Sequence, residues 1–179
     1  MAVHLILGGA RSGKSSFAEQ CVIAQQAERA RHYVATAQPF DAEMASRIAH
    51  HKQRRDETWL EHECPTALAA LVEDFGSNDV VLVDCLTLWM NNVIYNHGET
   101  ASEAQIRSQV SQLVAALEKS SATFVLVSNE VGLGVVPMGE VSRLFVDHAG
   151  WMNQAVAKLA EKVTFIAAGL PMTLKSGHE

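Results

Sequence analysis

Cysteine and proline are scarce in this sequence, and long apolar runs are missing from it. The three cysteines, Cys21, Cys64 and Cys85, lie far apart without C-x-x-C spacing, so no disulfide framework is expected. The first apolar run, 3–7, is too short for a signal peptide, and no run approaches the roughly 18 apolar residues of a membrane-spanning helix. We therefore expect a soluble protein of the reducing cytoplasm, without a membrane span.

Basic residues are also in deficit. Fourteen Lys+Arg stand against twenty Asp+Glu, which gives a formal net charge of -6 at pH 7. This balance argues against a general surface for nucleic acid or other polyanions. With 179 residues, 48% of them hydrophobic, the composition excludes disorder and predicts one compact domain over residues 1–179.

Short apolar runs alternate with segments of helical period along the chain. Strands are predicted at 3–7, 32–36, 80–83, 123–127 and 163–168, with a weaker one at 58–62. Helices are predicted at 14–30, 41–54, 65–75, 86–95, 102–119 and 140–161. This order is typical of an α/β fold in which helices flank a mostly parallel central sheet. After residue 168 we expect only a short polar tail.

A phosphate-binding motif follows the first predicted strand. Residues 8–15 fit G-x-x-x-x-G-K-[ST] in full and precede a predicted helix, which is the context that this P-loop motif requires. The candidate nucleotide-binding residues are Gly8, Gly9, Ala10, Arg11, Ser12, Gly13, Lys14 and Ser15. Glycines allow backbone N–H groups to surround phosphate oxygens, and the helix N-terminus attracts anions. A glycine-rich turn that binds nothing is the alternative, which this context disfavours.

Three residues are expected to serve the phosphates and a magnesium ion. Lys14 is expected to reach the β- and γ-phosphates, and Ser15 to place its hydroxyl on Mg²⁺. Asp84 closes the apolar run 80–83 and is the second candidate ligand of Mg²⁺. Its alternative role is that of a capping or turn aspartate at a strand end.

The predicted helix 41–54 concentrates histidine and arginine. At helical spacing, Arg47, His50 and Arg54 share one face, whereas His51 falls on the apolar stripe. Two guanidiniums beside His50 favour its neutral imidazole, whose free nitrogen can attack phosphorus while the guanidiniums clamp phosphate. A solvated basic face with incidental histidines is an equally open interpretation.

Structural zinc is a further alternative for this region. His50, His51, His62 and Cys64 are all residue types that bind zinc, but their spacing matches no standard zinc motif.

Five motifs follow one another over nearly the whole chain: GGARSGKS at 8–15, YVATAQ at 33–38, RIAHHK at 47–52, VDCLTLW at 83–89 and SNEVG at 128–132. In this order they resemble the bifunctional adenosylcobinamide kinase / adenosylcobinamide-phosphate guanylyltransferase family of cobalamin biosynthesis. The resemblance implies a RecA-like P-loop fold.

Two reactions are implied by this resemblance. A nucleoside triphosphate, ATP or GTP, phosphorylates adenosylcobinamide, and GTP then transfers GMP to adenosylcobinamide phosphate, giving adenosyl-GDP-cobinamide and pyrophosphate. In the family the second reaction passes through a covalent GMP-histidine, a role that the third motif assigns to His50. The family also implies a homotrimer.

The resemblance extends the candidate site beyond the P-loop. The residues implied in binding the guanine nucleotide or its metal are Ala35, Thr36, His51, Lys52, Gln53, Arg54, Glu63 and Asp84. Thr36 and Asp84 lie at the predicted carboxyl ends of strands, where open α/β sheets bind ligands. Asn129 and Glu130 also follow a predicted strand end, and we leave them outside the predicted site.

Other functions compete with this interpretation. A monofunctional small-molecule kinase needs only the P-loop and Asp84 and forms no covalent adduct. A GTP-binding switch is disfavoured because the chain lacks an N-K-x-D sequence, and a nucleic-acid-dependent motor because of the net charge of -6.

Overall fold

The computed structural model describes residues 2–25, 28–38, 57–96 and 99–177. The predicted helix 41–54 lies outside the described residues. Along the chain the elements are β1 (Ala2–Gly8), α1 (Lys14–Ile23), β2 (Ala30–Ala35), β3 (Trp59–Glu63), α3 (Leu68–Glu73), β4 (Asp79–Asp84), α4 (Leu86–Ile94), β5 (Tyr95–Asn96), β6 (Glu99–Thr100), α5 (Glu103–Lys119), β7 (Thr123–Asn129), α6 (Glu140–Leu159), β8 (Lys162–Ala167) and β9 (Leu170–Lys175).

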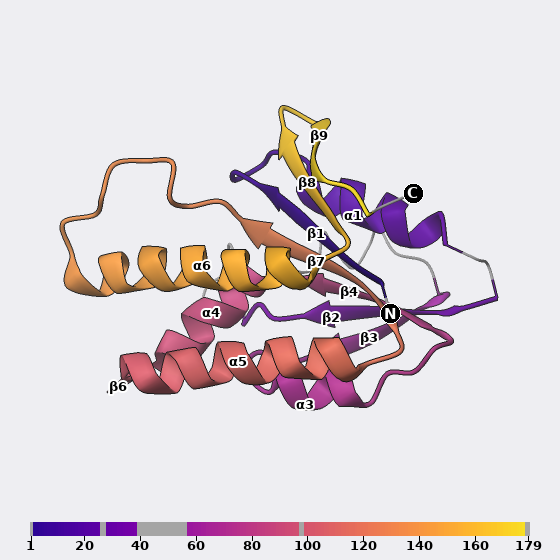
Figure 1. Cartoon of the computed structure of the whole chain (residues 1–179), viewed down its shortest axis with the longest axis horizontal. Coiled ribbons are helices and arrows are strands. Elements are labelled where there is room, and N and C mark those ends of the chain that lie inside the picture. Colours follow the sequence, from indigo (N-terminus) through magenta and orange to yellow (C-terminus); the bar gives the residue numbers. More distant parts are fainter. Residues whose placement is uncertain (1, 26–27, 39–56, 97–98, 178–179) are drawn as a thin grey trace.

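A seven-stranded sheet organises the described part of the chain. Its strand order is β3-β2-β4-β7-β1-β8-β9. Every neighbouring pair from β3 to β8 is parallel, and only β9 runs antiparallel, on the outer edge of β8. The predicted α/β fold with a mostly parallel sheet is therefore confirmed (Figure 1).

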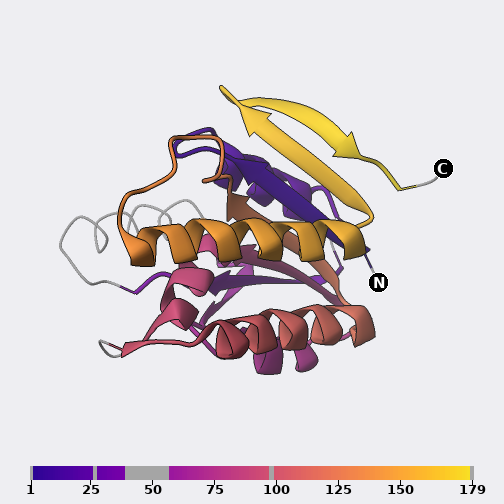
Figure 2. The same ribbon diagram turned by 60° about the vertical axis from the view of Figure 1, so that its left-hand side comes forward.

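The two faces of the sheet bury two apolar clusters. Along β4, Val81 and Val83 face the larger cluster, which α3, α4, α5 and α6 cover. Val80 and Leu82 face the smaller cluster, which α1 covers with residues such as Val22. Helices thus lie on both sides of the sheet, as Figures 1 and 2 show, because side chains alternate between the faces of a strand.

Local capping signals explain where two helices begin. Ser102 and Gln105 form a capping box before α5, since the Ser102 hydroxyl accepts from the Gln105 N–H while the Gln105 side chain accepts from the Ser102 N–H. Before α4, the Cys85 thiol accepts from the Leu88 N–H. Cys85, and not Asp84, is therefore the cap of α4.

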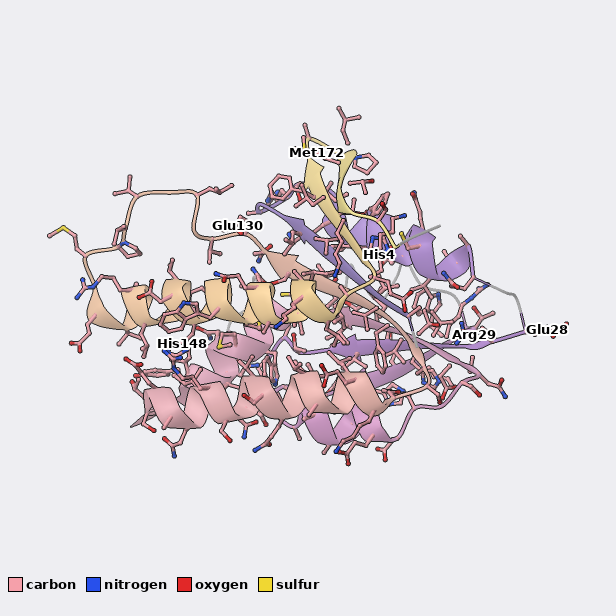
Figure 3. All side chains as sticks on the ribbon, in the orientation of Figure 1. His4, Glu28, Arg29, Glu130, His148 and Met172 are labelled. Carbon is pink, nitrogen blue, oxygen red and sulfur yellow. The ribbon has the colours of Figure 1, made fainter. Side chains whose placement is uncertain are left out.

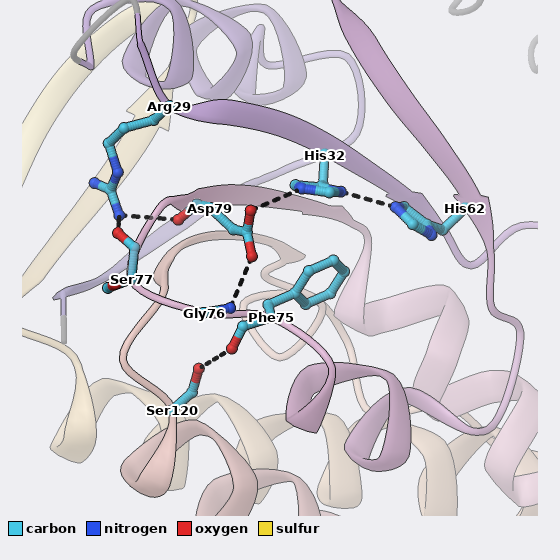
Figure 4. Close-up of polar contacts among 8 residues, drawn as sticks. All are labelled: Arg29, His32, His62, Phe75, Gly76, Ser77, Asp79 and Ser120. Atoms are coloured by element: carbon cyan, nitrogen blue, oxygen red, sulfur yellow. Dashed lines mark hydrogen bonds and ion pairs between the residues drawn. The ribbon is translucent and has the colours of Figure 1, made fainter.

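The first two described helices are shorter than predicted. Helix α1 ends at Ile23, not at residue 30, because Arg29 donates to the backbone carbonyls of Ser77 and Asp79 and draws the chain into β2 (Figure 4). Helix α3 begins at Leu68 rather than at residue 65, because side chains of α4 bind the backbone carbonyls of residues 65 and 66. In both cases a contact distant in sequence overrides the local helical pattern.

The predicted polar tail after residue 168 is wrong, since β9 pairs with β8 there (Figure 2). The chain reverses at Ala168 and Gly169, which both have a positive φ. Every residue of β9 is exposed, so no burial pattern marks this strand in the sequence. The Lys175 ammonium donates to backbone carbonyls of Ala157 and Lys158, and thereby anchors the hairpin to the end of α6.

None of the helices in the described residues combines the length and the apolar character needed to cross a lipid bilayer.

Candidate active site

The carboxyl ends of the parallel strands meet at one edge of the sheet. In the strand register, Gly8 lies opposite Asn129, and Ala35 lies between Asp84 and Glu63. Five sequence segments are thus gathered at the edge where open α/β sheets bind ligands. The P-loop follows the end of β1 at this edge and leads into α1.

Tight packing and turn geometry explain the two outer glycines of the P-loop. A Cβ on Gly8 would lie 2.6 Å from the Ser12 Oγ and 2.7 Å from the Ile166 carbonyl oxygen. Gly13 has φ 95°, which side chains disfavour, and it caps α1 without a side-chain hydrogen bond. A helix N-terminus whose capping residue has no side-chain acceptor suits the binding of an anion.

The hairpin of β8 and β9 supports this loop from outside. The Gly169 N–H donates to the Ser12 carbonyl oxygen over 2.9 Å, and the Ser12 N–H donates to the Gly9 carbonyl. The turn that sequence reasoning took for a tail therefore holds the middle of the P-loop in place.

Lys14 is buried and bends back over the loop. Its side chain is only 9% exposed, and its ammonium donates to the Gly9 carbonyl oxygen over 3.0 Å. Burial lowers the Lys14 pKa below its usual value, while the neighbouring Cys85 and Asp84 act in the opposite direction. The Lys14 ammonium thus lies against the backbone of the loop that is predicted to surround the phosphates.

Asp84 lies on the same face of the sheet as α1. It continues the alternation of Val80 and Leu82, which pack beneath α1, and the Tyr33 hydroxyl is 3.4 Å from its Oδ2. A carboxylate here and the Ser15 hydroxyl in the first turn of α1 are oxygen donors of the kind that Mg²⁺ prefers. The donor set fits a magnesium ion that takes its remaining ligands from phosphates and water.

Thr36 is placed at this edge but its polar groups are all engaged. Its hydroxyl bonds both the N–H and the carbonyl of Cys85, and its own carbonyl accepts from Asn92. In the described structure Thr36 therefore holds the Asp84–Cys85 segment in position. Ala35 is half-buried beside it, and Glu63 is exposed at the end of β3.

The remaining predicted residues are not placed. His50, His51, Lys52, Gln53 and Arg54 lie outside the described residues. The structure therefore brings together the P-loop, Asp84, Ala35, Thr36 and the end of β3, and it leaves the histidine segment as a prediction.

Two of the four residues considered for zinc can be examined. The His62 Nε2 lies 2.9 Å from the His32 Nδ1, and the His32 Nε2 lies 3.2 Å from the Asp79 Oδ1 (Figure 4). Cys64 is buried in the larger apolar cluster. Within the described ranges, no group of three or more His, Cys, Asp or Glu residues is arranged to hold a metal ion.

Other histidines and tryptophans serve packing. His148 is buried on α6 at the side that faces α5 (Figure 3). Its ring meets that of Trp151 edge to face. Trp59 and Trp89 are buried, and the half-exposed Trp151 carries the Arg107 guanidinium 4.4 Å from its ring centroid.

The sequence did not predict a cluster of hydrogen-bonded polar side chains that lies behind the P-loop. The Ser128 hydroxyl donates to the Asn153 Oδ1 and lies 3.2 Å from the Thr87 hydroxyl, which accepts from the Asn129 N–H. The polar residues directly after the apolar run 123–127 are the signal that points to this cluster.

A family model described as cobinamide kinase / cobinamide phosphate guanyltransferase matches residues 4–174. The chain belongs to this family. The match includes the P-loop, the segment around His50, Asp84 and the polar residues after β7. The family resemblance predicted from the five motifs is thereby confirmed.

Curated relatives of the cobinamide kinase / guanyltransferase family match nearly the whole chain. The chain is 48% identical over 172 residues to the bifunctional adenosylcobalamin biosynthesis protein CobP of Pseudomonas aeruginosa, covering 96% of both proteins. It is 38% identical to the bifunctional adenosylcobalamin biosynthesis protein CobU of Escherichia coli, and 37% identical to that of Salmonella typhimurium. In each case 96% of this chain and 98% of the relative are covered.

Solved structures support the fold beyond this family. The flagellar accessory protein FlaH of Methanocaldococcus jannaschii matches with a TM-score of 0.54 at 14% identity, over 98% of this chain and 79% of that one. A structure from Pyrococcus horikoshii, described as Project ID PH0250, matches with a TM-score of 0.59 at 7% identity, over 99% and 88%. Together with the sheet order and the P-loop, these similarities identify a RecA-like P-loop fold.

Proposed function

We propose that this protein phosphorylates adenosylcobinamide with ATP or GTP and then transfers GMP from GTP to adenosylcobinamide phosphate. The products of the second reaction are adenosyl-GDP-cobinamide and pyrophosphate. The observation that carries the proposal is the continuous match of residues 4–174 to a family named for both reactions. The P-loop geometry at the carboxyl edge supports it independently.

The nucleotide is assigned to residues at that edge and in the histidine segment. The proposed binding residues are Gly8, Gly9, Ala10, Arg11, Ser12, Gly13, Lys14, Ser15, Ala35, Thr36, His51, Lys52, Gln53, Arg54, Glu63 and Asp84. The P-loop N–H groups and the Lys14 ammonium neutralise the phosphate chain in both reactions. Thr36 contributes by holding Cys85, and thereby Asp84, in place.

Ser15 and Asp84 are the proposed ligands of Mg²⁺. The ion, when bound, screens negative charge on the phosphates. Asp84 provides the carboxylate from β4, and Ser15 provides the hydroxyl from the first turn of α1. Both residues belong to elements that pack together across the smaller apolar cluster, so their approach is set by the fold.

His50 is the proposed nucleophile of guanylyl transfer. A ring nitrogen forms a bond to the α-phosphorus of GTP while the bond from that phosphorus to the α,β-bridging oxygen breaks, and pyrophosphate leaves with the electron pair. A phosphate oxygen of adenosylcobinamide phosphate then displaces His50 from the same phosphorus. Arg47 and Arg54, at helical spacing from His50, support this role by favouring its neutral imidazole.

Labelled GTP tests the proposal directly. The protein is incubated with Mg²⁺ and GTP labelled at the α- or the γ-phosphate, denatured, and analysed for retained label. We expect acid-labile, alkali-stable α-label that is lost in His50→Ala and retained in His62→Gln, a control histidine engaged with His32. Addition of adenosylcobinamide phosphate should discharge the label into product.

A monofunctional small-molecule kinase is the alternative. It predicts transfer of γ-phosphate to adenosylcobinamide with no α-label on the protein, and His50→Ala would then leave turnover unchanged. That pattern would refute the role of His50 and retain only the kinase half of the proposal.

The assembly and location are proposed from the same resemblance. We expect a cytoplasmic homotrimer, which light scattering on the purified protein would identify by a mass about three times that of one chain. A monomer across the micromolar range would contradict the homotrimer.

A further inference from the structure

The side chain of Asn129 faces the P-loop helix. Along β7, Phe124 and Leu126 face the larger apolar cluster, whereas Val125 and Val127 face the smaller cluster beneath α1. By the two-residue period of a strand, Asn129 continues the face of Val127. Its amide therefore lies on the side of the sheet where α1 and Asp84 lie.

Hydrogen bonds hold the Asn129 backbone at a set distance from the P-loop. Its N–H donates to the Thr87 hydroxyl over 2.6 Å, and its carbonyl accepts from the Asn153 side chain. Asn129 lies opposite Gly8 in the sheet, and the Glu130 N–H donates to the Gly8 carbonyl oxygen over 3.1 Å. The Asn129 backbone is thus one strand spacing, about 4.8 Å, from the backbone of Gly8, the first residue of the motif.

The side-chain oxygen of Asn129 is buried. Within the described part of the chain, this Oδ1 has no hydrogen-bond partner. The Ser12 Oγ, which lies against Gly8, is also buried and has no hydrogen-bond partner among the described residues. A buried polar atom without a partner is costly and rare, so two of them in residues next to Gly8 indicate a ligand that completes them.

Two other asparagines of this region show the contrast. Asn92 donates through its amide to the carbonyls of Thr36 and Pro65. Asn153 accepts from Ser128 and donates to the Asn129 carbonyl. Both of these amides form hydrogen bonds within the protein, whereas the Asn129 Oδ1 forms none among the described residues.

We propose that Asn129 is a catalytic residue of the kinase reaction, whose amide bridges the attacking hydroxyl and the γ-phosphoryl group. This inference rests on the proposed function. The Oδ1 accepts the hydrogen bond of the acceptor hydroxyl, which is the donor that it lacks in the structure, and the Nδ2 donates to a γ-phosphate oxygen.

The bond changes are those of an in-line displacement. The hydroxyl oxygen forms a bond to the γ-phosphorus as the bond from that phosphorus to the β,γ-bridging oxygen breaks. The electron pair leaves with the nucleoside diphosphate, and the hydroxyl proton passes to solvent. Asn129 takes up no proton and orients both reactants, since an amide does not titrate in this range.

Two substitutions at Asn129 and one behind it test the proposal. Asn129→Ala removes both the acceptor Oδ1 and the donor Nδ2 of the amide. Asn129→Asp keeps a similar shape, but it removes the donor and adds a negative charge beside the phosphate. Ser128→Ala breaks the bond to Asn153 behind the strand and leaves the Asn129 amide in place. Phosphorylation of adenosylcobinamide and guanylylation of added adenosylcobinamide phosphate are measured separately for each protein.

We expect Asn129→Ala to lower kcat of phosphorylation about 100-fold, a loss typical of one positioned group at a transition state, and to change guanylylation less than about threefold. It should weaken binding of a non-hydrolysable Mg²⁺–GTP analogue roughly tenfold and leave GDP binding unchanged, because GDP lacks the γ-phosphate. Asn129→Asp should weaken analogue binding further, by repulsion. Thermal stability of Asn129→Ala should match or exceed that of the wild type, because an unpaired buried group is removed.

Equal losses in both reactions, or a parallel loss of stability in Asn129→Ala and Ser128→Ala, would show a structural role and overturn the proposal. So would unchanged phosphorylation. If the wild-type protein fails to phosphorylate adenosylcobinamide, the proposed function fails, and the binding comparison between the GTP analogue and GDP still decides whether Asn129 contacts the γ-phosphate.

Discussion

The hydroxyl of Thr36 forms hydrogen bonds with both backbone polar groups of Cys85. It donates to the Cys85 carbonyl oxygen over 2.7 Å and accepts from the Cys85 N–H over 2.9 Å. Thr36 follows β2, and Cys85 follows β4 and caps α4. One fully buried side chain therefore ties together two strand ends and positions the neighbouring Asp84.

Removing that hydroxyl should destabilise the protein. Thr36→Val keeps the shape of the side chain but leaves the buried Cys85 N–H without its partner, while the Cys85 carbonyl oxygen still accepts from the Trp89 N–H. We therefore expect a loss of about 1–3 kcal/mol in the free energy of unfolding. Urea titration measures it. Thr36→Ser retains the hydroxyl and should lose less than about 1.5 kcal/mol. Equal losses in the two variants would show that the methyl group of Thr36, and not the hydrogen bonds of its hydroxyl, stabilises the protein.

The first two glycines of the P-loop should differ in their tolerance of alanine. A Cβ on Gly8 would meet a backbone oxygen at 2.7 Å, whereas nothing lies within 4 Å of a Cβ on Gly9. We expect Gly8→Ala to cost about 1–3 kcal/mol of stability and Gly9→Ala less than about 0.5 kcal/mol, measured by thermal or urea unfolding. A stable Gly8→Ala would contradict the packing at this position.

Lys14 should reduce stability in the absence of nucleotide. Burial disfavours its charged form and lowers its pKa, so Lys14→Met should raise stability by roughly 1 kcal/mol at pH 7 and lower both activities at least about 100-fold. Calorimetry and the two assays provide the readouts. Lys119→Met removes an exposed lysine in the last turn of α5 and should leave both activities intact. Loss of stability in Lys14→Met would mean that its bond to Gly9 outweighs its desolvation.

His4 should make the protein sensitive to acid. Burial, assisted by the positive charge of Lys162, lowers the His4 pKa to about 4, and its Nε2 lies 2.8 Å from the Thr164 hydroxyl. Because the folded pKa lies below the unfolded value of 6.5, this contribution to stability is complete above pH 6.5 and is lost as the pH falls towards 4.

Urea unfolding at pH 7.5 and pH 5 checks this sign. The stability difference between the two pH values should be smaller in His4→Gln than in the wild type, by roughly 1–2 kcal/mol. The neighbouring charge can be tested in the same way, since Lys162→Gln should raise the His4 pKa and reduce the acid sensitivity. An unchanged difference in His4→Gln would place the acid sensitivity elsewhere, for instance at His62 or His148, whose pKa values are also lowered by burial.

Much of the site was accessible from local sequence. The P-loop is a contiguous motif between a strand and a helix, and Asp84 ends an apolar strand, so both follow from short-range pattern. The extent of α1, the start of α3 and the strand β9 did not follow from such patterns. Each depends on a partner distant in sequence, such as the carbonyls that Arg29 binds or the β8 edge that β9 joins.

By itself, the sequence determined the alternation of strands and helices, the phosphate-binding loop and the family, because each is written in residues close together along the chain. The tertiary structure alone decided that the Thr36 hydroxyl is engaged by Cys85, 49 positions away, and that the Asn129 Oδ1, in the strand beside Gly8, finds no partner among the described residues. Whether a polar group is satisfied depends on which distant groups the packed sheet brings within hydrogen-bonding distance, and no local pattern carries that information.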